Sequence, residues 1–351
     1  MISIIMPTLN EANNLEILFR RIAKLKLRNY EIIVADSNSK DNTIGMAKNL
    51  ASRKKWPIKA IQTGNTDLSN AIIKALPKAK GDIVAVIDAD LQHPPELLPK
   101  MFDLLKKGND IVIASRFAKG AKTELNLRRI CISRVYITLS HIFVPKTKTI
   151  KDPASGYFAF KKKILKNVRL EPIGFKILLE ILAKANYSND KVLEIPFTFG
   201  LRARGKSKFN LKQSFIAFKH LLKLATYSKE HHRLLKFLAI GATGIVINEG
   251  LLWLLTESGL FYLFSSLIAI ETSIISNFIF NDLWTFKKER KGKFFTRFGK
   301  FNLVRLATLA INFIVLWVLT SLGLYYLLSN LVGIAIATTI GYLASLWWVW
   351  K

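Results

Sequence analysis

Two aspartates one residue apart, Asp88 and Asp90, follow an apolar run in the stretch VIDADLQHPP (86–95). Aspartate disfavours strands and neighbouring carboxylates repel each other, so this pair needs a positively charged partner. Together with Gln92 the two carboxylates offer the hard oxygen ligands that Mg²⁺ or Mn²⁺ prefers. We therefore expect a metal site at these three residues that could hold a diphosphate. The alternative is a short acidic pair on a solvated turn.

Polar side chains also follow the apolar runs nearer the amino terminus. One run ends, and a helical pattern opens, at Pro7, Thr8, Leu9 and Glu11. Backbone N–H groups and a carboxylate at such a place could bind the base and ribose of a nucleotide. The alternative is a helix start whose polar groups only cap the first turn. Asp36 ends the next run and is a second candidate for a nucleotide contact.

Basic residues form two further candidate groups. Arg116 follows the run DIVIAS (110–115), where its guanidinium could bind a diphosphate or a carboxylate near the metal. The alternative is a surface arginine. Arg202 and Lys208 belong to the spacing R-x-x-G-x-S-K, in which small residues would let a basic loop close over phosphates. A loop whose charges are only solvated is the alternative.

A third basic group lies in the amphipathic stretch 125–144, which includes Arg128, Arg129 and Ser133. A helix of this kind can lie among lipid headgroups, and its cations would bind a phosphate acceptor that arrives from the membrane. Ordinary surface charge on a core helix is the alternative. Residues 209–227 show the same pattern and predict a second interfacial helix.

The elements that must position these side chains alternate between strand and helix. Alternation of this kind predicts an α/β unit with a mostly parallel sheet and helices on both faces, and ligands of such sheets bind beyond the carboxyl ends of the strands. The expected strands are residues 2–8, 31–36, 58–63, 82–88 and 110–116, and the expected helices are residues 13–25, 41–53 and 67–79.

The remainder of the chain is apolar over long stretches, at about 234–256, 262–283, 303–320 and 325–350. Each approaches the roughly 20 residues that a helix needs to cross a bilayer. The links 229–236 and 287–300 are basic, whereas 256–262 and 321–326 contain no lysine or arginine. Because basic flanks stay cytoplasmic, we expect four spans in the cell membrane with both termini and the α/β unit on the cytoplasmic side.

The apolar part also repeats at a constant offset of 64 residues, so that Asn248 matches Asn312 and Trp284 matches Trp348. This predicts two duplicated helix hairpins. Three acids, Glu249, Glu271 and Asp282, lie in or at the ends of the spans. For these we leave open a functional role and helix–helix pairing with, for example, Asn248, Asn312 or Arg305.

The formal net charge is +29, of which +23 falls on residues 1–228 and +6 on residues 229–351. A strongly basic front part is typical of a nucleic-acid binder or of an enzyme that works at an anionic membrane on phosphate-bearing substrates. Four spans and the lack of a recognisable RNA- or DNA-binding motif favour the membrane enzyme, so no nucleic-acid partner is expected. The single cysteine, Cys131, excludes an intramolecular disulfide.

Several motifs resemble one known family, glycosyltransferase family two, and within it the dolichol-phosphate mannose synthases. They are IIMPTLNEANNL, IIVADSNSKDNT, VIDADLQHPPE, SRFAKG, DPASGYFAFKK and R-x-x-G-x-S-K, which cover about residues 1–230 in one order. The C-terminal part resembles the GtrA-like four-helix membrane domain. One departure concerns Ala35 and Asp36, where relatives often carry two acids, so that Asp36 would make the nucleotide contact alone.

The resemblance implies a GT-A fold and mannose transfer from GDP-mannose to a polyprenyl phosphate. We expect domains at 1–208 (GT-A), 209–229 (interfacial helix and linker) and 230–351 (membrane). The expected nucleotide-sugar site comprises Pro7, Thr8, Leu9, Glu11, Asp36, Asp88, Ala89, Asp90, Gln92, Arg116, Arg202 and Lys208. Within it, Asp90, Arg116, Arg202 and Lys208 are the expected catalytic residues; Arg128, Arg129 and Ser133 are expected to bind the acceptor phosphate.

We predict an inverting, metal-dependent transfer to dolichyl or another polyprenyl phosphate. An acceptor that is already an anion needs alignment and charge shielding rather than a general base. Two alternatives stay open: the same reaction with UDP-glucose as donor, and a lipid-linked-sugar flippase or scaffold with a nucleotide-sugar-binding module. The sequence makes no prediction of the oligomeric state.

Overall fold

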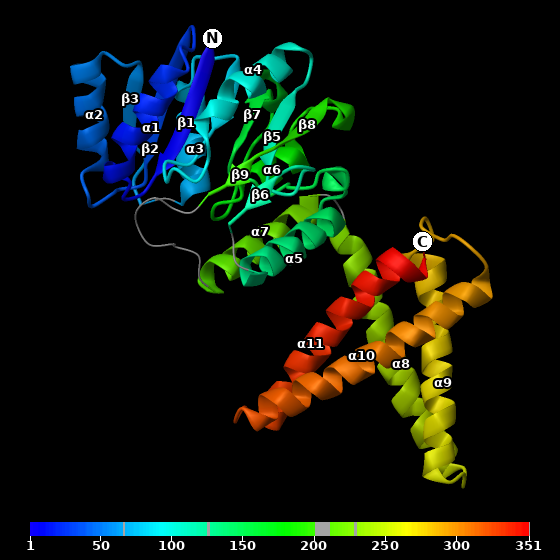
Figure 1. Ribbon diagram of the computed structural model, residues 1–351. Helices are drawn as coiled ribbons and strands as arrows, with labels where there is room; N and C mark the ends of the chain where they lie inside the picture. The colour runs from blue at the N-terminus through cyan, green and yellow to red at the C-terminus, as the bar shows by residue number, and fades with distance from the viewer. Residues whose placement is uncertain (66, 125–126, 201–210, 228–229, 351) are drawn as a thin grey trace. The chain divides into compact units, whose positions relative to one another are not determined.

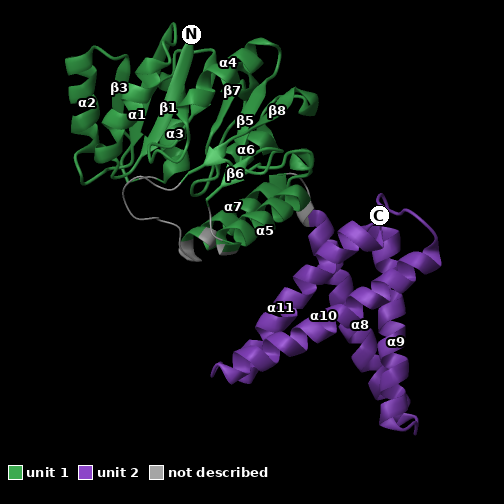
Figure 2. Ribbon diagram, in the orientation of Figure 1, with its two compact units in different colours: residues 1–228 green, residues 229–351 purple. Residues whose placement is uncertain are grey.

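The computed structural model describes residues 1–65, 67–124, 127–200, 211–227 and 230–350. The chain divides into two compact units, an N-terminal unit of residues 1–228 and a C-terminal unit of residues 229–351 (Figure 2).

A seven-stranded sheet forms the centre of the N-terminal unit, in the order β3-β2-β1-β4-β7-β5-β8 (Figure 1). All neighbours pair in parallel except β7, which is antiparallel to both β4 and β5. The strands are β1 (Ile2–Thr8), β2 (Tyr30–Asp36), β3 (Ile58–Gln62), β4 (Ile83–Val86), β5 (Ile111–Ser115), β7 (Phe158–Lys161) and β8 (Val192–Pro196). A separate pair joins β6 (Lys122–Thr123) to β9 (Thr198–Phe199).

Helices cover both faces of this sheet, which confirms the predicted fold class. The helices of the N-terminal unit are α1 (Ala12–Lys24), α2 (Thr43–Lys54), α3 (Leu68–Ala75), α4 (Leu98–Lys106), α5 (Leu127–Phe143), α6 (Ile177–Lys184) and α7 (Leu211–Tyr227). One core holds apolar residues of α1, α2 and α4, and the other holds those of α3 and α6. Since both faces are covered, the central strands are continuous apolar runs, and Ile4 and Ile5 of β1 are both fully buried although they point to opposite faces.

The first five strands match the expected ranges closely, but one central strand was not predicted. Residues 158–161 form β7, which lies between β4 and β5. They belong to the stretch DPASGYFAFKK, which the sequence analysis used as a family motif and did not assign to a strand. An antiparallel insertion here explains why β4 and β5 are not neighbours. The helices α5 and α7 pack against each other. Figure 1 shows them next to the end of the sheet at which the carboxyl terminus of β1 lies.

The C-terminal unit consists of two helix hairpins whose boundaries repeat at the predicted offset of 64 residues. The first hairpin contains α8 (Glu230–Glu257) and α9 (Tyr262–Phe280), and the second contains α10 (Phe294–Ser321) and α11 (Tyr326–Ala344). A π-helical turn ends each hairpin, at Asn281–Thr285 and Ser345–Val349. Every boundary of the first hairpin therefore recurs in the second, and the predicted duplication is confirmed.

The surface of the C-terminal unit is apolar rather than polar. Trp317 is 72% exposed and Phe313 is 61% exposed, which would be costly in water but not in hydrocarbon. Four helices in the described part of the chain are long and apolar enough to cross a membrane. The chain is thus an integral membrane protein.

One acid of the C-terminal unit takes part in a structural ion-pair network. Asp282 accepts hydrogen bonds from Arg297 (Nε to Oδ1, 2.9 Å) and from the indole of Trp350 (Nε1 to Oδ1, 2.8 Å). Arg290 lies 3.6 Å away on the other oxygen. These contacts join the ends of the two hairpins, so the observed partners of Asp282 differ from the residues that the sequence suggested.

Candidate active site

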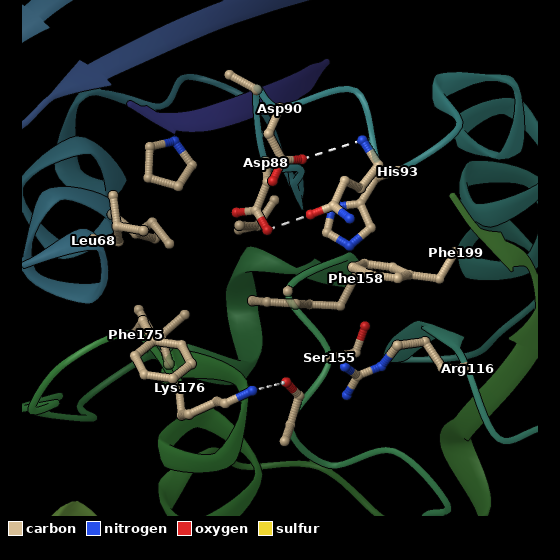
Figure 3. Close-up of a pocket in the computed structure, with 18 of the residues that line it drawn as sticks. Leu68, Asp88, Asp90, His93, Arg116, Ser155, Phe158, Phe175, Lys176 and Phe199 are labelled. Atoms are coloured by element: carbon tan, nitrogen blue, oxygen red, sulfur yellow. Dashed lines mark hydrogen bonds and ion pairs between the residues drawn. The ribbon is translucent and has the colours of Figure 1, made fainter. Parts of the chain in front are cut away.

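The carboxyl ends of β1, β4 and β5 meet at a cavity of about 280 Å³ (Figure 3). Its wall is built from loops after the strands, from α5 and from the start of α6. Ten of the sequence-predicted residues line it: Pro7, Leu9, Glu11, Asp88, Ala89, Asp90, Gln92, Arg116, Arg129 and Ser133. Segments more than a hundred residues apart in the chain therefore converge on one site.

The Asp88–Gln92 segment is shaped by a strained backbone. Leu91 has φ 65°, in the left-handed region that bulky side chains rarely adopt. The resulting turn brings the N–H of Gln92 to 3.1 Å from Asp90 Oδ1. The side-chain amide of Gln92 donates through Nε2 to the carbonyl oxygen of Gly200 at 2.8 Å, which leaves Oε1 as the atom suited to a metal. In Figure 3 the side chains of Asp88 and Asp90 lie on the same side of the cavity.

Gly156 lies beside Asp88, where a side chain would have to displace the carboxylate. A Cβ atom at Gly156 would lie 2.8 Å from Asp88 Oδ2, a distance that real Cβ contacts do not reach. The stretch DPASGY therefore places its glycine where a carboxylate of the opposite loop must approach the backbone. This close approach is a physical reason for a glycine at position 156 of the motif.

His93 lies behind the two aspartates and is buried among aromatic rings. Its ring centroid is 5.3 Å from that of Tyr157 and 5.5 Å from that of Phe199, and its Nδ1 is 3.5 Å from Asp88 Oδ2. Burial lowers the pKa of His93 to about 4, partly offset by the negative charge of Asp90. The imidazole is consequently neutral near pH 7 and a poor proton acceptor.

Arg116 is held in the cavity wall by a buried carboxylate. Its Nε and Nη2 donate to the two oxygens of Asp152, each at 2.8 Å, and its backbone N–H donates to Oδ2 at 3.1 Å. Asp152 is fully buried and is itself fixed, because its N–H donates to Glu194 Oε1 at 2.9 Å. The fork geometry gives the guanidinium one orientation.

Lys176 is a cavity cation that the sequence interpretation missed. It precedes α6, and its Nζ donates to the carbonyl oxygen of Ala154 at 3.0 Å (Figure 3). Burial of the amine and the nearby charge of Arg116 lower the pKa of Lys176 to about 8, although Asp152 and Asp88 act in the opposite direction. The stretch GFK gave no signal of this role, since a lysine at a helix start is common on any surface.

A second cavity, of about 190 Å³, continues from the first between α5 and α7. The two share Arg116, Ser133, Ala154, Phe175 and Lys176. The remaining wall of the second cavity is mostly apolar and consists of Ile132, Val135, Tyr136, Leu139, Ala217 and Phe218. A polar, cationic end thus leads into a hydrophobic groove.

Two predicted residues, Thr8 and Asp36, are buried and do not line the cavity. Asp36 is 1% exposed and accepts hydrogen bonds from Thr8 Oγ1 at 2.9 Å and from the N–H of Ser39 at 2.9 Å. Its carboxylate therefore organises the loop after β2. Asp41 also stabilises the local backbone, because its carboxylate accepts hydrogen bonds from the N–H of Thr43 and from the N–H of Ala12 at the start of α1.

Three other predicted residues lie beyond what the structure describes. Arg202 and Lys208 fall within residues 201–210, and Arg128 lies on α5 with a side chain outside the described part. Their roles stay predictions.

Comparison with known proteins places both units in known families. Residues 3–169 match glycosyl transferase family 2, and residues 236–350 match the GtrA/DPMS transmembrane domain. The chain is 46% identical to a dolichol-phosphate mannosyltransferase of Pyrococcus furiosus, over 98% of this chain and 97% of the relative. It is 31% identical to the dolichol-phosphate mannosyltransferase of Saccharomyces cerevisiae, over 67% of this chain and 91% of that relative.

Among solved structures, the fold is similar to that of glucosyl-3-phosphoglycerate synthase from Mycobacterium tuberculosis, crystallised with Mn²⁺, UDP-glucose and phosphoglyceric acid. The TM-score is 0.51 and the identity 21%, over 64% of this chain and 80% of that one. Both units match a family model, and the chain is similar to the Pyrococcus furiosus relative over nearly its full length. This chain therefore belongs to the glycosyl transferase family 2 enzymes of the dolichol-phosphate mannosyltransferase type, with a GtrA/DPMS transmembrane domain.

Proposed function

We propose that this protein transfers mannose from GDP-mannose to dolichyl phosphate or another polyprenyl phosphate, with inversion and with a divalent metal. The names of the two relatives support the mannosyl and dolichyl parts. The observation that carries the proposal is the cavity itself. It has two carboxylates on one wall and Arg116, Arg129 and Lys176 on the other, and it opens into an apolar groove.

The donor is held at the strand ends. Pro7, Leu9 and Glu11 contribute to the wall next to the two aspartates, where a nucleotide would lie against backbone and carboxylate. Asp88, Asp90 and the Oε1 atom of Gln92 would bind Mg²⁺ or Mn²⁺, a set of hard oxygen ligands that fits either ion. When bound, the ion neutralises charge on the diphosphate.

The acceptor enters from the opposite side. Its phosphate binds the cations Arg129 and Lys176, with Ser133 as a hydroxyl donor, and its first prenyl units fill the groove between α5 and α7. A phosphate oxygen forms the new bond to the anomeric carbon while the bond from that carbon to the diphosphate breaks, and GDP leaves. No proton has to be removed from the acceptor, which agrees with a buried neutral His93.

Arg116 is the group best placed to stabilise the departing diphosphate. Asp152 fixes two of its nitrogens, so the guanidinium is aligned before the substrate arrives. Arg202 and Lys208 would complete the clamp as a basic loop. The basic ends of the spans support a cytoplasmic position for both termini and the N-terminal unit.

One assay tests the donor and acceptor together. The purified protein in detergent is offered GDP-mannose, UDP-glucose or GDP-glucose, each with dolichyl phosphate and Mn²⁺, and the lipid product and its anomeric configuration are determined. The expected product is β-linked mannosyl phosphate formed from GDP-mannose alone. Transfer from UDP-glucose at an equal or higher rate would refute the donor assignment, and an α-linked product would refute inversion.

A further inference from the structure

A cavity of about 550 Å³, with several polar residues in a mostly apolar lining, lies among the membrane helices of the C-terminal unit. This size falls within the roughly 300–1,000 Å³ that is usual for small-molecule sites. Its lining includes six polar residues, Asn248, Glu249, Ser273, Asn277, Arg305 and Thr338. Polar groups at membrane depth are costly, so six of them around one cavity need an explanation.

Arg305 supplies the positive charge in the lining of this cavity, and its guanidinium makes cation–π contacts with two aromatic rings. Its guanidinium carbon is 4.6 Å from the ring centroid of Phe301 and 5.7 Å from that of Phe237. Among the described residues, no carboxylate lies within ion-pair distance of it. A guanidinium that is stacked on rings but not neutralised keeps its N–H donors for an anion.

The asparagines around Arg305 offer acceptors. Asn248 Oδ1 and Asn277 Oδ1 are both buried and have no hydrogen-bond partner in the described part of the chain. Glu249 is exposed to the cavity side and accepts one hydrogen bond, from Asn248 Nδ2 at 3.1 Å. A buried oxygen without a partner destabilises the structure, and a ligand whose hydroxyl donors reached these oxygens would remove that cost.

The duplication shows that these polar groups are not needed to build a hairpin pair. Since every helix boundary recurs at an offset of 64 residues, each lining residue has a counterpart in the other hairpin. Each polar residue and its counterpart are as follows: Asn248 and Asn312, Glu249 and Phe313, Ser273 and Ala337, Asn277 and Gly341, Arg305 and Gly241, Thr338 and Ile274. Five of the six polar residues are thus apolar or glycine in the equivalent place, so the two related surfaces do not share this polar lining.

The depth of Arg305 suits a lipid headgroup. It follows Lys300 by five residues of α10, about 7 Å along the helix axis, at the end of the span next to the basic link 287–300. Positive charge at this level lies where lipid phosphates meet the acyl chains.

We propose that this cavity binds a lipid phosphodiester whose headgroup carries hydroxyl groups. The phosphate pairs with Arg305, and hydroxyl donors satisfy Asn248, Asn277 and Glu249. A simple phosphate monoester lacks those donors and would also meet the negative charge of Glu249. Two lipids have this chemistry: a glycosyl prenyl phosphate, which is the product under the proposed function, and a polyol phospholipid such as phosphatidylinositol.

The full-length protein in phosphatidylcholine nanodiscs tests the proposal by photolabelling. The probe is mannosyl-phosphoryl prenol with a diazirine in its first prenyl unit, and labelled peptides are located by mass spectrometry. We expect labelling in two places, in residues 1–228 and in α8–α10 near the cavity. Labelling confined to residues 1–228 would overturn the membrane site.

Variants assign the contacts. Arg305→Gln should reduce labelling of α8–α10 by at least tenfold, Asn248→Leu by about fivefold, and Arg305→Lys should retain most of it. Lys300→Gln is the matched control, since this cation lies on the same helix, outside the cavity and over Trp348. Equal loss in Lys300→Gln would show that surface charge alone recruits the probe. Thermal unfolding checks that each variant is folded.

Competition identifies the ligand. Unlabelled mannosyl-phosphoryl prenol or phosphatidylinositol should displace the probe from α8–α10, and whichever does so more strongly is the preferred ligand. Prenyl phosphate without sugar should be at least tenfold weaker; equal strength would refute the hydroxyl contacts. Transfer activity of Arg305→Gln should stay within twofold of the wild type, so failure of this site and failure of the proposed reaction give different results.

Discussion

The two walls of the candidate active-site cavity are built by different means. The strand-end wall, with Asp88 and Asp90, consists of short loops whose backbone is held by the sheet, as in the hydrogen bond from Ile87 N to Ile5 O at 3.2 Å. The helical wall, with Arg129 and Lys176, belongs to α5 and the segment before α6, and side chains hold it in place. One wall is acidic and rigid, and the other is basic and depends on helix packing.

Under the proposed function, this difference matches the two substrates. A nucleoside diphosphate sugar has a compact polar head, and a rigid loop can meet it with fixed carboxylates and a metal. A prenyl phosphate brings an anion attached to a long apolar chain, so it needs cations at the mouth of an apolar groove. Helices that pack through side chains can form such a groove and can separate slightly to admit the chain.

The largest effect should come from the rigid wall. We expect Asp90→Ala to lower kcat at least about a thousandfold, since a lost ligand removes metal stabilisation of several kcal/mol. Excess EDTA should have the same effect on the wild type and Mn²⁺ should restore activity. Circular dichroism and thermal unfolding provide the control for folding. A folded variant with near-normal turnover would contradict the metal assignment at this wall.

A single cation of the helical wall should matter less and should affect one substrate only. Arg129→Ala is expected to lower kcat/KM for the lipid by about 10- to 100-fold, as expected for a charge-assisted contact of roughly 1.5–3 kcal/mol, and to leave GDP-mannose affinity unchanged. Arg134→Ala is the matched control, because Arg134 lies on the same helix with its guanidinium over Phe117 at 4.3 Å. Loss of donor binding in Arg129→Ala would assign this residue to the other wall.

The two walls also differ in how far the sequence predicted them. Asp88, Asp90 and Glu11 follow apolar runs, and because parallel strands end at one edge, their convergence could be inferred without a structure. The position of Lys176 in the cavity and the apolar groove could not be inferred. Both depend on how α5, α6 and α7 pack together, and α5 and α7 begin more than 80 residues apart in the chain. The same reason applies to β7, which is antiparallel and short, and to the pairing of Arg116 with Asp152, which lies 36 residues further along the chain.

Lys176 provides a test by pH. Because burial holds the pKa of Lys176 near 8, its amine is cationic below that pH and neutral above it. We expect kcat/KM for the lipid to fall as the pH rises through about 8, and Lys176→Arg to remove this fall because arginine stays charged. Lys176→Met should be about tenfold less active than the wild type at pH 7 and insensitive over the same range. An unchanged pH profile in Lys176→Arg would mean that another group titrates.

The smallest kinetic effect is expected from the contact that holds the helical wall together. Glu180 of α6 is fully buried and accepts from His220 Nε2 on α7 at 2.6 Å, from Lys184 Nζ at 2.6 Å and from the N–H of Glu171 at 2.7 Å. Burial would raise the pKa of Glu180, but the hydrogen bonds from His220 and Lys184 outweigh it and lower this pKa to about 2. A carboxylate with a lowered pKa stabilises the folded state above its ordinary value of 4.5, and that stability is lost as the pH falls from there towards 2.

Glu180→Gln should therefore lower the free energy of unfolding by roughly 3 kcal/mol at pH 7, because two buried partners lose their anion. The difference from the wild type should shrink below pH 4.5. Since α7 loses an anchor and not a catalytic group, KM for the lipid should rise only a few-fold, with kcat and donor affinity unchanged. Glu171→Gln is the matched control, because it breaks a half-exposed ion pair (3.2 Å) to Lys223 of α7 that solvent screens, and it should leave the stability almost unchanged. If Glu180→Gln weakened the binding of GDP-mannose as much as that of the lipid, the two walls would be one cooperative structure, and the separation between a rigid donor wall and a packed acceptor wall would be wrong.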